Sequence, residues 1–245
     1  MYMKIAKQIL LQTFAMFVRD DGPKILYYHD VFAAKKYYLH GTPLELFKQH
    51  FYWIMANGYV IKDKLPIHDK ELMLTFDDGY KGLWDCREFF YEYNLKPTVF
   101  IAVDLVGQDR YLSWAEILEL QRMGFNFQAH TWTHRRLTEI PHSDLEHELR
   151  DARLFLSDKL GEDVDQLCFP QGRFNSEIME LARGYGYRLF YSCIYGNADK
   201  RILPDLVCRQ LVQEVGVGTL KAILRGGANP FWRRYYKLHY LDCER

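Results

Sequence analysis

The sequence has no excess of charge of either sign. Lys and Arg total 32 in the 245 residues and Asp and Glu also total 32, so the formal net charge is zero. Proteins that bind the nucleic-acid backbone usually carry a basic excess. The composition therefore argues against a nucleic-acid partner. It suits an uncharged substrate, which needs no electrostatic steering.

Long apolar runs and disordered stretches are scarce. The longest segment without a charged residue, 49–61, has 13 residues and includes His50 and Asn57. A membrane-spanning helix needs about 20 apolar residues, so none is predicted. With only 8 Pro and 16 Gly against 49% hydrophobic residues, the composition is typical of a globular protein with a large core.

Cysteine is sparse and scattered. Five cysteines, at positions 86, 168, 193, 208 and 243, form no C-x-x-C pair, which argues against a disulfide framework and a thiolate zinc site. Polar residues interrupt the apolar run after Lys4 and Lys7, and no small-x-small cleavage site follows it. Free thiols without an export signal predict a cytoplasmic location, with membrane association as a possible addition.

The two ends of the chain differ in character from its middle. In the N-terminal segment, 1–23, Ile5, Ile9, Met16 and Phe17 recur at near-helical spacing. They predict an amphipathic helix, for which packing on the body is favoured over peripheral membrane contact. The tail, 224–245, gathers aromatic and basic residues that either pack on the surface or touch a membrane or an acidic partner. The oligomeric state stays open.

Between these ends, residues 24–223 alternate short apolar runs with helical patterns and form one predicted domain. We expect strands at 24–28, 59–61, 71–76, 98–103, 125–129, 166–169, 188–192 and 206–212. Capping boxes at Ser113/Glu116 and Ser143/Glu146, a stripe over 44–54 and a pattern over 175–185 predict the helices. Such alternation predicts an α/β fold with parallel strands, and the number of units favours a barrel.

Three predicted strands end in reactive residues. Asp77-Asp78 follows 71–76, His130 and His134 follow 125–129, and His29-Asp30 follows 24–28. Alone, the aspartates could cap a helix, and two histidines four residues apart are a weak signal. Together, one Asp and two His make a ligand set that suits zinc or another divalent metal and leaves positions open for water.

These residues carry a resemblance. The run Thr75-Phe76-Asp77-Asp78-Gly79-Tyr80, followed by His130-Thr131-Trp132-Thr133-His134, resembles the polysaccharide deacetylase (NodB-homology) family, and Phe169-Pro170-Gln171-Gly172 resembles its third motif. The resemblance implies a distorted (β/α) barrel of about seven parallel strands. It also implies metal-dependent removal of an acyl group from an acylated amino sugar.

The resemblance also implies roles for single residues. Asp78, His130 and His134 would hold the metal, and Asp77 would be the general base. The turn at Pro170 and Gln171 would offer a backbone N–H to the oxyanion. Apart from the resemblance, Trp132 is a candidate sugar contact, because it lies between the two histidines and aromatic faces stack on pyranose rings.

Two departures from the family pattern matter. Cys168 stands where the family usually has an Arg that orients the base, and Gln171 stands where it has an aromatic residue. Arg209 is the candidate substitute for that Arg, although an ordinary surface position is an equal alternative.

The second departure concerns the general acid. Ile25-Leu26-Tyr27-Tyr28-His29 is similar to the family's closing Leu-x-His strand but opens the barrel here, as in the circularly permuted branch that includes exopolysaccharide deacetylases. We therefore expect His29 to be the acid, with Asp30 orienting it. His239 is the competing candidate, and His29 could also be structural.

Three functions follow. The leading one is a metal-dependent hydrolase that removes an acetyl group from an N-acetylated amino sugar of a polysaccharide or glycan precursor, most simply with zinc. One alternative is an intracellular deacylase of a lipid-linked or nucleotide-linked sugar. Another, motivated by Cys168 and Gln171, is an inactive carbohydrate-binding pseudoenzyme.

Overall fold

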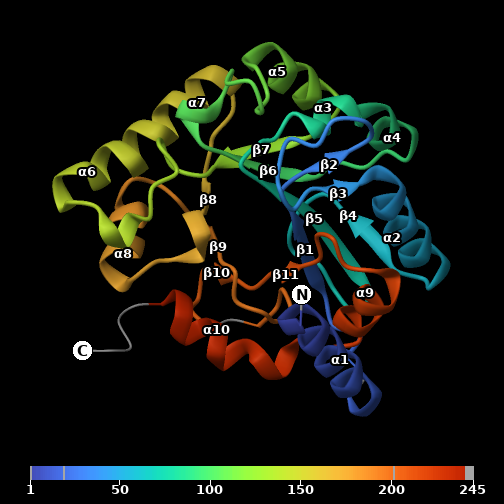
Figure 1. Cartoon of the computed structure of the whole chain (residues 1–245). Helices are drawn as coiled ribbons and strands as arrows, with labels where there is room; N and C mark the ends of the chain where they lie inside the picture. Colours follow the sequence, from blue (N-terminus) through green and yellow to red (C-terminus); the bar gives the residue numbers. More distant parts are fainter. Residues whose placement is uncertain (1, 19, 201, 241–245) are drawn as a thin grey trace.

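Parallel strands surrounded by helices form the body of the protein (Figure 1). The computed structural model describes residues 2–18, 20–200 and 202–240. The main strands are β1 (Lys24–Tyr28), β4 (Val60–Lys62), β5 (Glu71–Asp77), β6 (Thr98–Ile101), β7 (Asn126–Ala129), β8 (Gln166–Cys168), β9 (Leu189–Tyr191), β10 (Leu206–Val207) and β11 (Gln210–Leu211). A separate pair, β2 (Val31–Phe32) and β3 (Thr42–Pro43), lies beside them.

The strand order shows how the sheet curls. It runs β10-β9-β8-β7-β6-β5-β1-β11, with β4 added on β5, and the pairs are parallel. β10 and β11 belong to one segment, 206–211, whose first half pairs with β9 and whose second half pairs with β1. This split segment joins the two ends of the sheet. The predicted distorted α/β barrel of about seven strands is confirmed.

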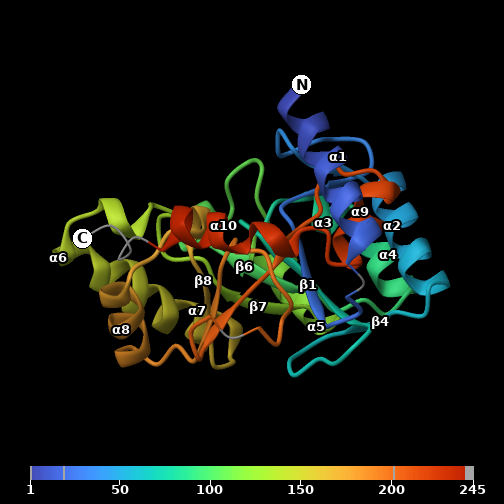
Figure 2. The ribbon, with the colours of Figure 1, turned by 90° about the horizontal axis from the view of Figure 1, so that it is seen from below.

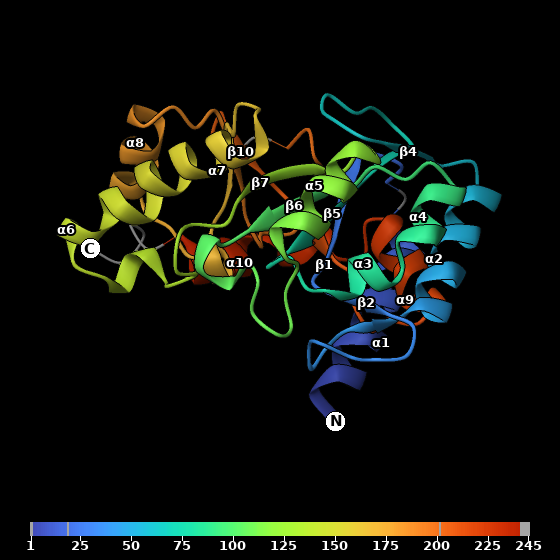
Figure 3. The same cartoon turned by 90° about the horizontal axis from the view of Figure 1, so that it is seen from above.

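Helices cover the outside of the sheet (Figures 1 and 3). They are α1 (Tyr2–Phe17), α2 (Leu44–Ala56), α3 (Gly82–Asp85), α4 (Arg87–Glu92), α5 (Trp114–Arg122), α6 (His142–Glu146), α7 (Ala152–Leu160), α8 (Ser176–Gly184), α9 (Val217–Leu224) and α10 (Trp232–His239). A π-helical turn, His147–Asp151, links α6 to α7.

The predicted helix starts are partly right. Ser113 and Glu116 form the expected capping box of α5. The box at Ser143/Glu146 is wrong, because α6 already begins at His142 and its N-cap, Pro141, makes no side-chain capping bond. The fixed φ of proline sets the start of the helix there in place of a hydroxyl group.

The barrel interior below the strand ends is filled. One buried cluster combines side chains from six strands: Ile25, Met73, Phe100, Cys168, Tyr191 and Val207. Their neighbours in the strands, such as Leu26 and Leu74, belong instead to the larger core that includes the helices. A filled interior leaves the carboxyl ends of the strands as the place for a site, as in other barrels of this kind.

Helix α1 packs differently from the prediction. Leu11 is buried on the α9 side, and a Cβ on Gly227 would lie only 2.3 Å from the Leu11 carbonyl oxygen. Ile9, Met16 and Phe17, expected to pack on the body, are exposed, and the side chain of Ile5 lies outside the described part. Residues 241–245 of the predicted tail also lie outside it. In the described chain, no helix is both long and apolar enough to cross a membrane.

Candidate active site

All the residues predicted at three strand ends except Asp30 line one cavity. It has a volume of about 350 Å³ and is lined by His29, Tyr38, Asp77, Asp78, Tyr80, Tyr111, His130, His134, Phe169, Gln171 and Cys193. β1, β5 and β7 lead directly to His29, Asp77 and His130. Residues as far apart in the sequence as His29 and Cys193 therefore meet at the carboxyl edge of the sheet.

Left-handed backbone at the strand ends separates neighbouring side chains. Asp78 and Gly79 both have φ of 72°, and Thr131 and His134 have φ of 70° and 63°. A Cβ at position 79 would lie 2.8 Å from Ile101 Cγ2, so this turn requires glycine. The sharp turn after β5 gives Asp77 and Asp78 different surroundings although they are adjacent.

Asp78, His130 and His134 bring three potential ligand atoms together. The Nε2 atoms of His130 and His134 lie 3.3 and 3.0 Å from Asp78 Oδ1. His130 Nδ1 donates to the Cys168 carbonyl oxygen at 2.7 Å, which leaves the Nε2 lone pair of the neutral ring facing Asp78. Asp78 Oδ1 is buried and has no hydrogen-bond partner in the described chain. Converging oxygen and nitrogen atoms of this kind fit a divalent metal ion.

Asp77 lies against a buried cation. The guanidinium of Arg209 binds both carboxylate oxygens, with Nη1 2.7 Å from Oδ1 and Nη2 2.8 Å from Oδ2. Arg209 is fully buried and also donates to the Ser192 carbonyl oxygen at 3.0 Å. Burial opposes ionisation of Asp77, but Arg209 outweighs it and holds the pKa of this carboxyl below its ordinary value. The structure thus places Arg209 where the Arg missing at position 168 was expected to act.

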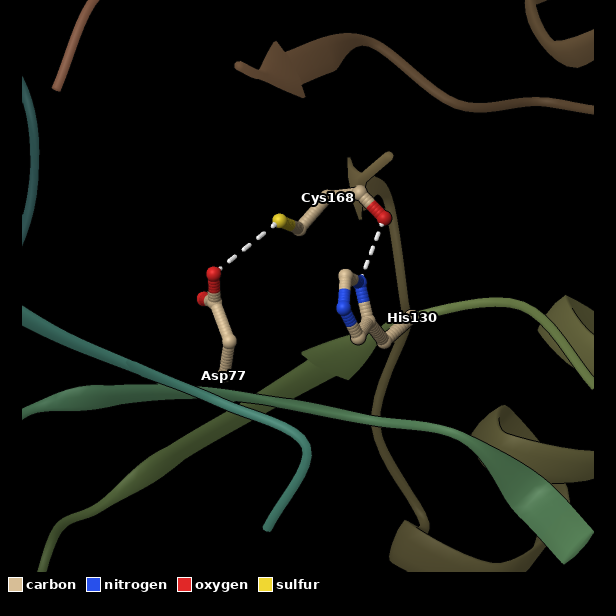
Figure 4. Close-up of side chains that lie close together, drawn as sticks. All are labelled: Asp77, His130 and Cys168. Carbon is tan, nitrogen blue, oxygen red and sulfur yellow. Dashed lines mark hydrogen bonds between the residues drawn. The ribbon is translucent and has the colours of Figure 1, made fainter. Parts of the chain in front are cut away.

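Cys168 lies beside Asp77 (Figure 4). Its sulfur is 3.0 Å from Arg209 Nη2 and 3.7 Å from Asp77 Oδ2. Asp77, His130 and Cys168 are close enough to suggest a second metal site. Burial, however, raises the pKa of the Cys168 thiol well above its usual range, and Arg209 already engages both oxygens of Asp77. This group fits a metal poorly, because a ligating cysteine must be deprotonated.

His29 and Asp30 separate at the end of β1. His29 lines the cavity, its ring stacks on Tyr38 at 4.9 Å, and its Nδ1 lies 2.8 Å from Gln213 Oε1. Asp30 is buried and accepts hydrogen bonds from the backbone N–H groups of Tyr37 and Tyr38. The expectation that Asp30 orients His29 is therefore wrong, and Gln213 holds the ring.

The third motif reaches the cavity through Gln171. This residue has φ of 55° in the short helix Pro170–Gly172, and its side-chain oxygen accepts a hydrogen bond from Arg136. Pro170 is buried behind it. His239 lies behind Gly172, whose Cβ would be 3.1 Å from His239 Nδ1, and it is not among the cavity-lining residues.

Trp132 does not face the cavity. Its indole Nε1 donates to Asp104 Oδ1 at 2.7 Å, and its ring lies 4.4 Å from that of His147. The expected sugar contact is therefore wrong for this side chain. The left-handed turn at Thr131 directs the residue that follows it away from the ligand side of the loop.

A buried acid that the sequence analysis missed supports the loop between the histidines. Glu148 is fully buried in the π-helical turn and accepts from the backbone N–H groups of Trp132 and Thr133 at 3.0 and 2.9 Å. It also pairs with Arg135 at 3.2 Å. Its position three residues after Leu145, on an apolar helix face, was the available signal.

Comparison with known proteins is consistent with this geometry. The sequence matches the polysaccharide deacetylase family over residues 64–190, just over half of the 245 residues. This region includes Asp77, Asp78, His130 and His134 but not His29 or Arg209. The "Putative polysaccharide deacetylase YxkH" of Bacillus subtilis is 25% identical over 188 residues, 72% of this chain and 66% of that protein. Chitin deacetylase 1 of Cryptococcus neoformans is 29% identical over 115 residues, 46% of this chain and 23% of that protein.

Solved structures share the fold. The Streptococcus pyogenes deacetylase PplD, in complex with acetate, aligns with a TM-score of 0.72 at 20% identity, over 83% of this chain and 98% of that chain. IcaB from Ammonifex degensii aligns with a TM-score of 0.72 at 19% identity, over 84% of this chain and 98% of that chain. With the strand-end motifs and the match over more than half of its length, this chain belongs to the polysaccharide deacetylase family.

Proposed function

We propose that the protein is a metal-dependent N-deacetylase that removes the acetyl group from an N-acetylated amino sugar of a polysaccharide or glycan precursor. The observation that carries the proposal is the division of labour between two adjacent aspartates at one cavity. Asp78 faces two imidazoles, whereas Asp77 is paired with Arg209. The family membership supports a hydrolase that deacetylates carbohydrate.

Asp78, His130 and His134 would hold the metal, for which zinc suits one oxygen and two nitrogen ligands. When bound there, such an ion would supply Lewis acidity to polarise the amide carbonyl and to acidify water. The protein residues prepare for it, because the Cys168 carbonyl oxygen fixes the His130 ring and Glu148 fixes the loop that leads to His134.

The proton transfers would fall to Asp77 and His29. Arg209 keeps Asp77 ionised and fixes its plane, so the carboxylate can take a proton from the attacking water. His29, held by Gln213, would give a proton to the departing amine, since an amide nitrogen leaves poorly as an anion. The backbone N–H of Gln171 would stabilise the oxyanion.

A row of tyrosines supports a sugar as the substrate. Tyr38, Tyr80 and Tyr111 line the cavity, and their rings stack in sequence with centroids 5.0 and 4.7 Å apart. An aromatic wall with a few convergent polar groups is the common form of a small-molecule site. Its uncharged surface suits the faces of pyranose rings.

The test is release of acetate from N-acetylglucosamine oligomers by the full chain. We expect activity to disappear after chelation and to return with zinc, while Glu139→Gln, an exposed change outside the cavity, behaves as wild type. Acetate release at the same rate in metal-free protein would contradict the proposal.

A further inference from the structure

Helix α1 has an apolar face that the rest of the described chain leaves uncovered. The side chains of Met16 and Phe17 are 80% and 82% exposed, and those of Ile9 and Leu10 are 58% and 46% exposed. Leu11 alone on this part of the helix is deeply buried, at 3%. Isolated exposed apolar side chains are common, but several on one helix end make a patch that usually has a partner.

Basic residues outnumber acidic ones around this patch, although Asp21 lines the same hollow as Met16 and Phe17, together with Lys70 and Arg225. Helix α1 contains Lys4 and Lys7 and no Asp or Glu, and the segment 215–240 contains five Lys or Arg residues and no acid. Arg233, Arg234 and Lys237 of α10 are exposed. A neutral chain therefore concentrates positive charge in its two terminal regions.

These regions lie together in the fold. Helix α1 contacts α9, and the ring of Phe14 meets that of Phe231, just before α10, edge to face at 5.7 Å. Figure 1 shows α1, α9 and α10 along the same side of the barrel. Apolar and basic groups of distant sequence thus contribute to one surface.

The middle of α1 lies near the candidate active site, whereas Met16 and Phe17 share a hollow with Asp21, Tyr59 and Lys70, which directly precede or lie near the starts of β1, β4 and β5. Gln8 and Leu11 of α1 line a second cavity, of about 190 Å³, together with Gln213, which holds His29 of the first cavity. In Figures 2 and 3, α1 and the loop after β6 project from the same end of the barrel. A partner that covers the whole of α1 would therefore lie along the side of the barrel.

We propose that α1, with the basic residues of α10 beside it, docks on an anionic lipid bilayer and holds this side of the barrel at the membrane surface. An amphipathic helix with Lys or Arg and large apolar residues binds such interfaces through both contributions. A second copy of this chain would present the same positive charge, and the two would repel. The inference goes beyond the proposed function and does not depend on it.

The test is flotation of the full chain with vesicles of phosphatidylcholine alone or mixed with phosphatidylglycerol. We expect binding to the anionic vesicles, weakened in 0.5 M salt because screening shortens the reach of surface charge. The double variant Met16→Glu/Phe17→Glu should bind at least about tenfold more weakly. Leu154→Glu, an exposed apolar change on α7 (54% exposed), is the matched control and should bind normally.

Acetate release from soluble oligomers, measured on the same samples, keeps the two proposals separate: it should not change in either variant. The docking proposal is overturned if wild type does not float with anionic vesicles, or if the Glu pair floats as well as wild type. It is also overturned if wild type is a dimer that the Glu pair converts to a monomer without any vesicle binding.

Discussion

Asp77 and Asp78 are adjacent in the chain, yet their carboxylates meet opposite surroundings. Behind Asp77, Arg209 satisfies both oxygens, and Cys168 and Ser192 complete a buried, fully engaged group. In front of Asp78, two imidazole nitrogens converge on a buried oxygen that lacks a hydrogen bond within the described chain. The Asp77 carboxylate is therefore fully bonded within the protein, whereas the Asp78 carboxylate is placed to bind a cation.

A third buried aspartate shows what decides the difference. Asp30 accepts backbone hydrogen bonds but has no ion-pair partner among residues 2–18, 20–200 and 202–240, and burial raises its pKa to about 6. Burial acts on Asp77 in the same direction, yet its pKa is lowered because Arg209 is present. The presence or absence of a contacting cation thus decides whether the pKa of a buried carboxyl is lowered, as for Asp77, or raised, as for Asp30.

The largest effect should come from removing the carboxylate of Asp78. Asp78→Ala deletes the oxygen on which both imidazoles converge, so we expect loss of most bound zinc and a fall in turnover of about 10³-fold or more. Zinc content by atomic emission and acetate release measure the two effects. Stoichiometric zinc in this variant would show that Asp78 is not a ligand.

The next largest effect should come from removing the cation that is paired with Asp77. Arg209→Met leaves a buried carboxylate without its cation, and we expect unfolding at neutral pH to require about 3–5 kcal/mol less free energy. Because the folded pKa of Asp77 is below 3.8, the pair stabilises the fold above about pH 4 and loses this effect as pH falls through the folded value. The difference between variant and wild type should therefore shrink in acid.

Chemical denaturation at pH 8 and at pH 2 checks this prediction. Arg183→Met is the control, since Arg183 forms a two-point contact with Asp205 at the surface and should contribute about 1 kcal/mol or less. Equal losses in the two variants would mean that the Arg209 pair has no special role in the fold.

A smaller effect is expected from replacing Gln213, which holds the proposed general acid, His29. Gln213→Leu removes the hydrogen bond to His29, so kcat should fall about 10- to 100-fold with zinc content unchanged. Gln213→Glu should restore much of the rate and move the alkaline limb of the pH–rate profile upward, because a carboxylate favours protonated imidazole. A profile identical to that of wild type in the Glu variant would remove His29 from the proton transfer.

The smallest effect on activity is expected at Asp30. Asp30→Asn removes a charge whose ionisation is unfavourable in the fold, so it should stabilise the protein at pH 8 by up to about 3 kcal/mol. The raised pKa means that the cost of ionisation grows as pH rises from about 4 and is complete above about 6, so the gain should largely vanish near pH 4. Thermal unfolding at the two pH values checks it, and a gain that persists at pH 4 would rule out this cause.

The features that could be predicted from the sequence are those that depend on residues close together in the chain. The strands and the residues that follow them, Asp77, Asp78, His130 and His29, were found because a parallel sheet brings its carboxyl ends to one edge. Arg209 was a candidate only because an expected Arg was missing. Gln213 and Glu148 were not found, since their contacts join segments whose distance and register the sequence does not encode locally. Trp132 was misplaced because a left-handed turn reverses the direction that spacing suggests.

The division of labour between the two aspartates is tested most directly by zinc content and acetate release in Asp77→Asn. The account predicts that this variant binds zinc as wild type does, because its ligands are Asp78, His130 and His134, and that turnover falls about 10²- to 10⁴-fold. Full turnover with zinc bound, or loss of zinc together with turnover, would contradict it.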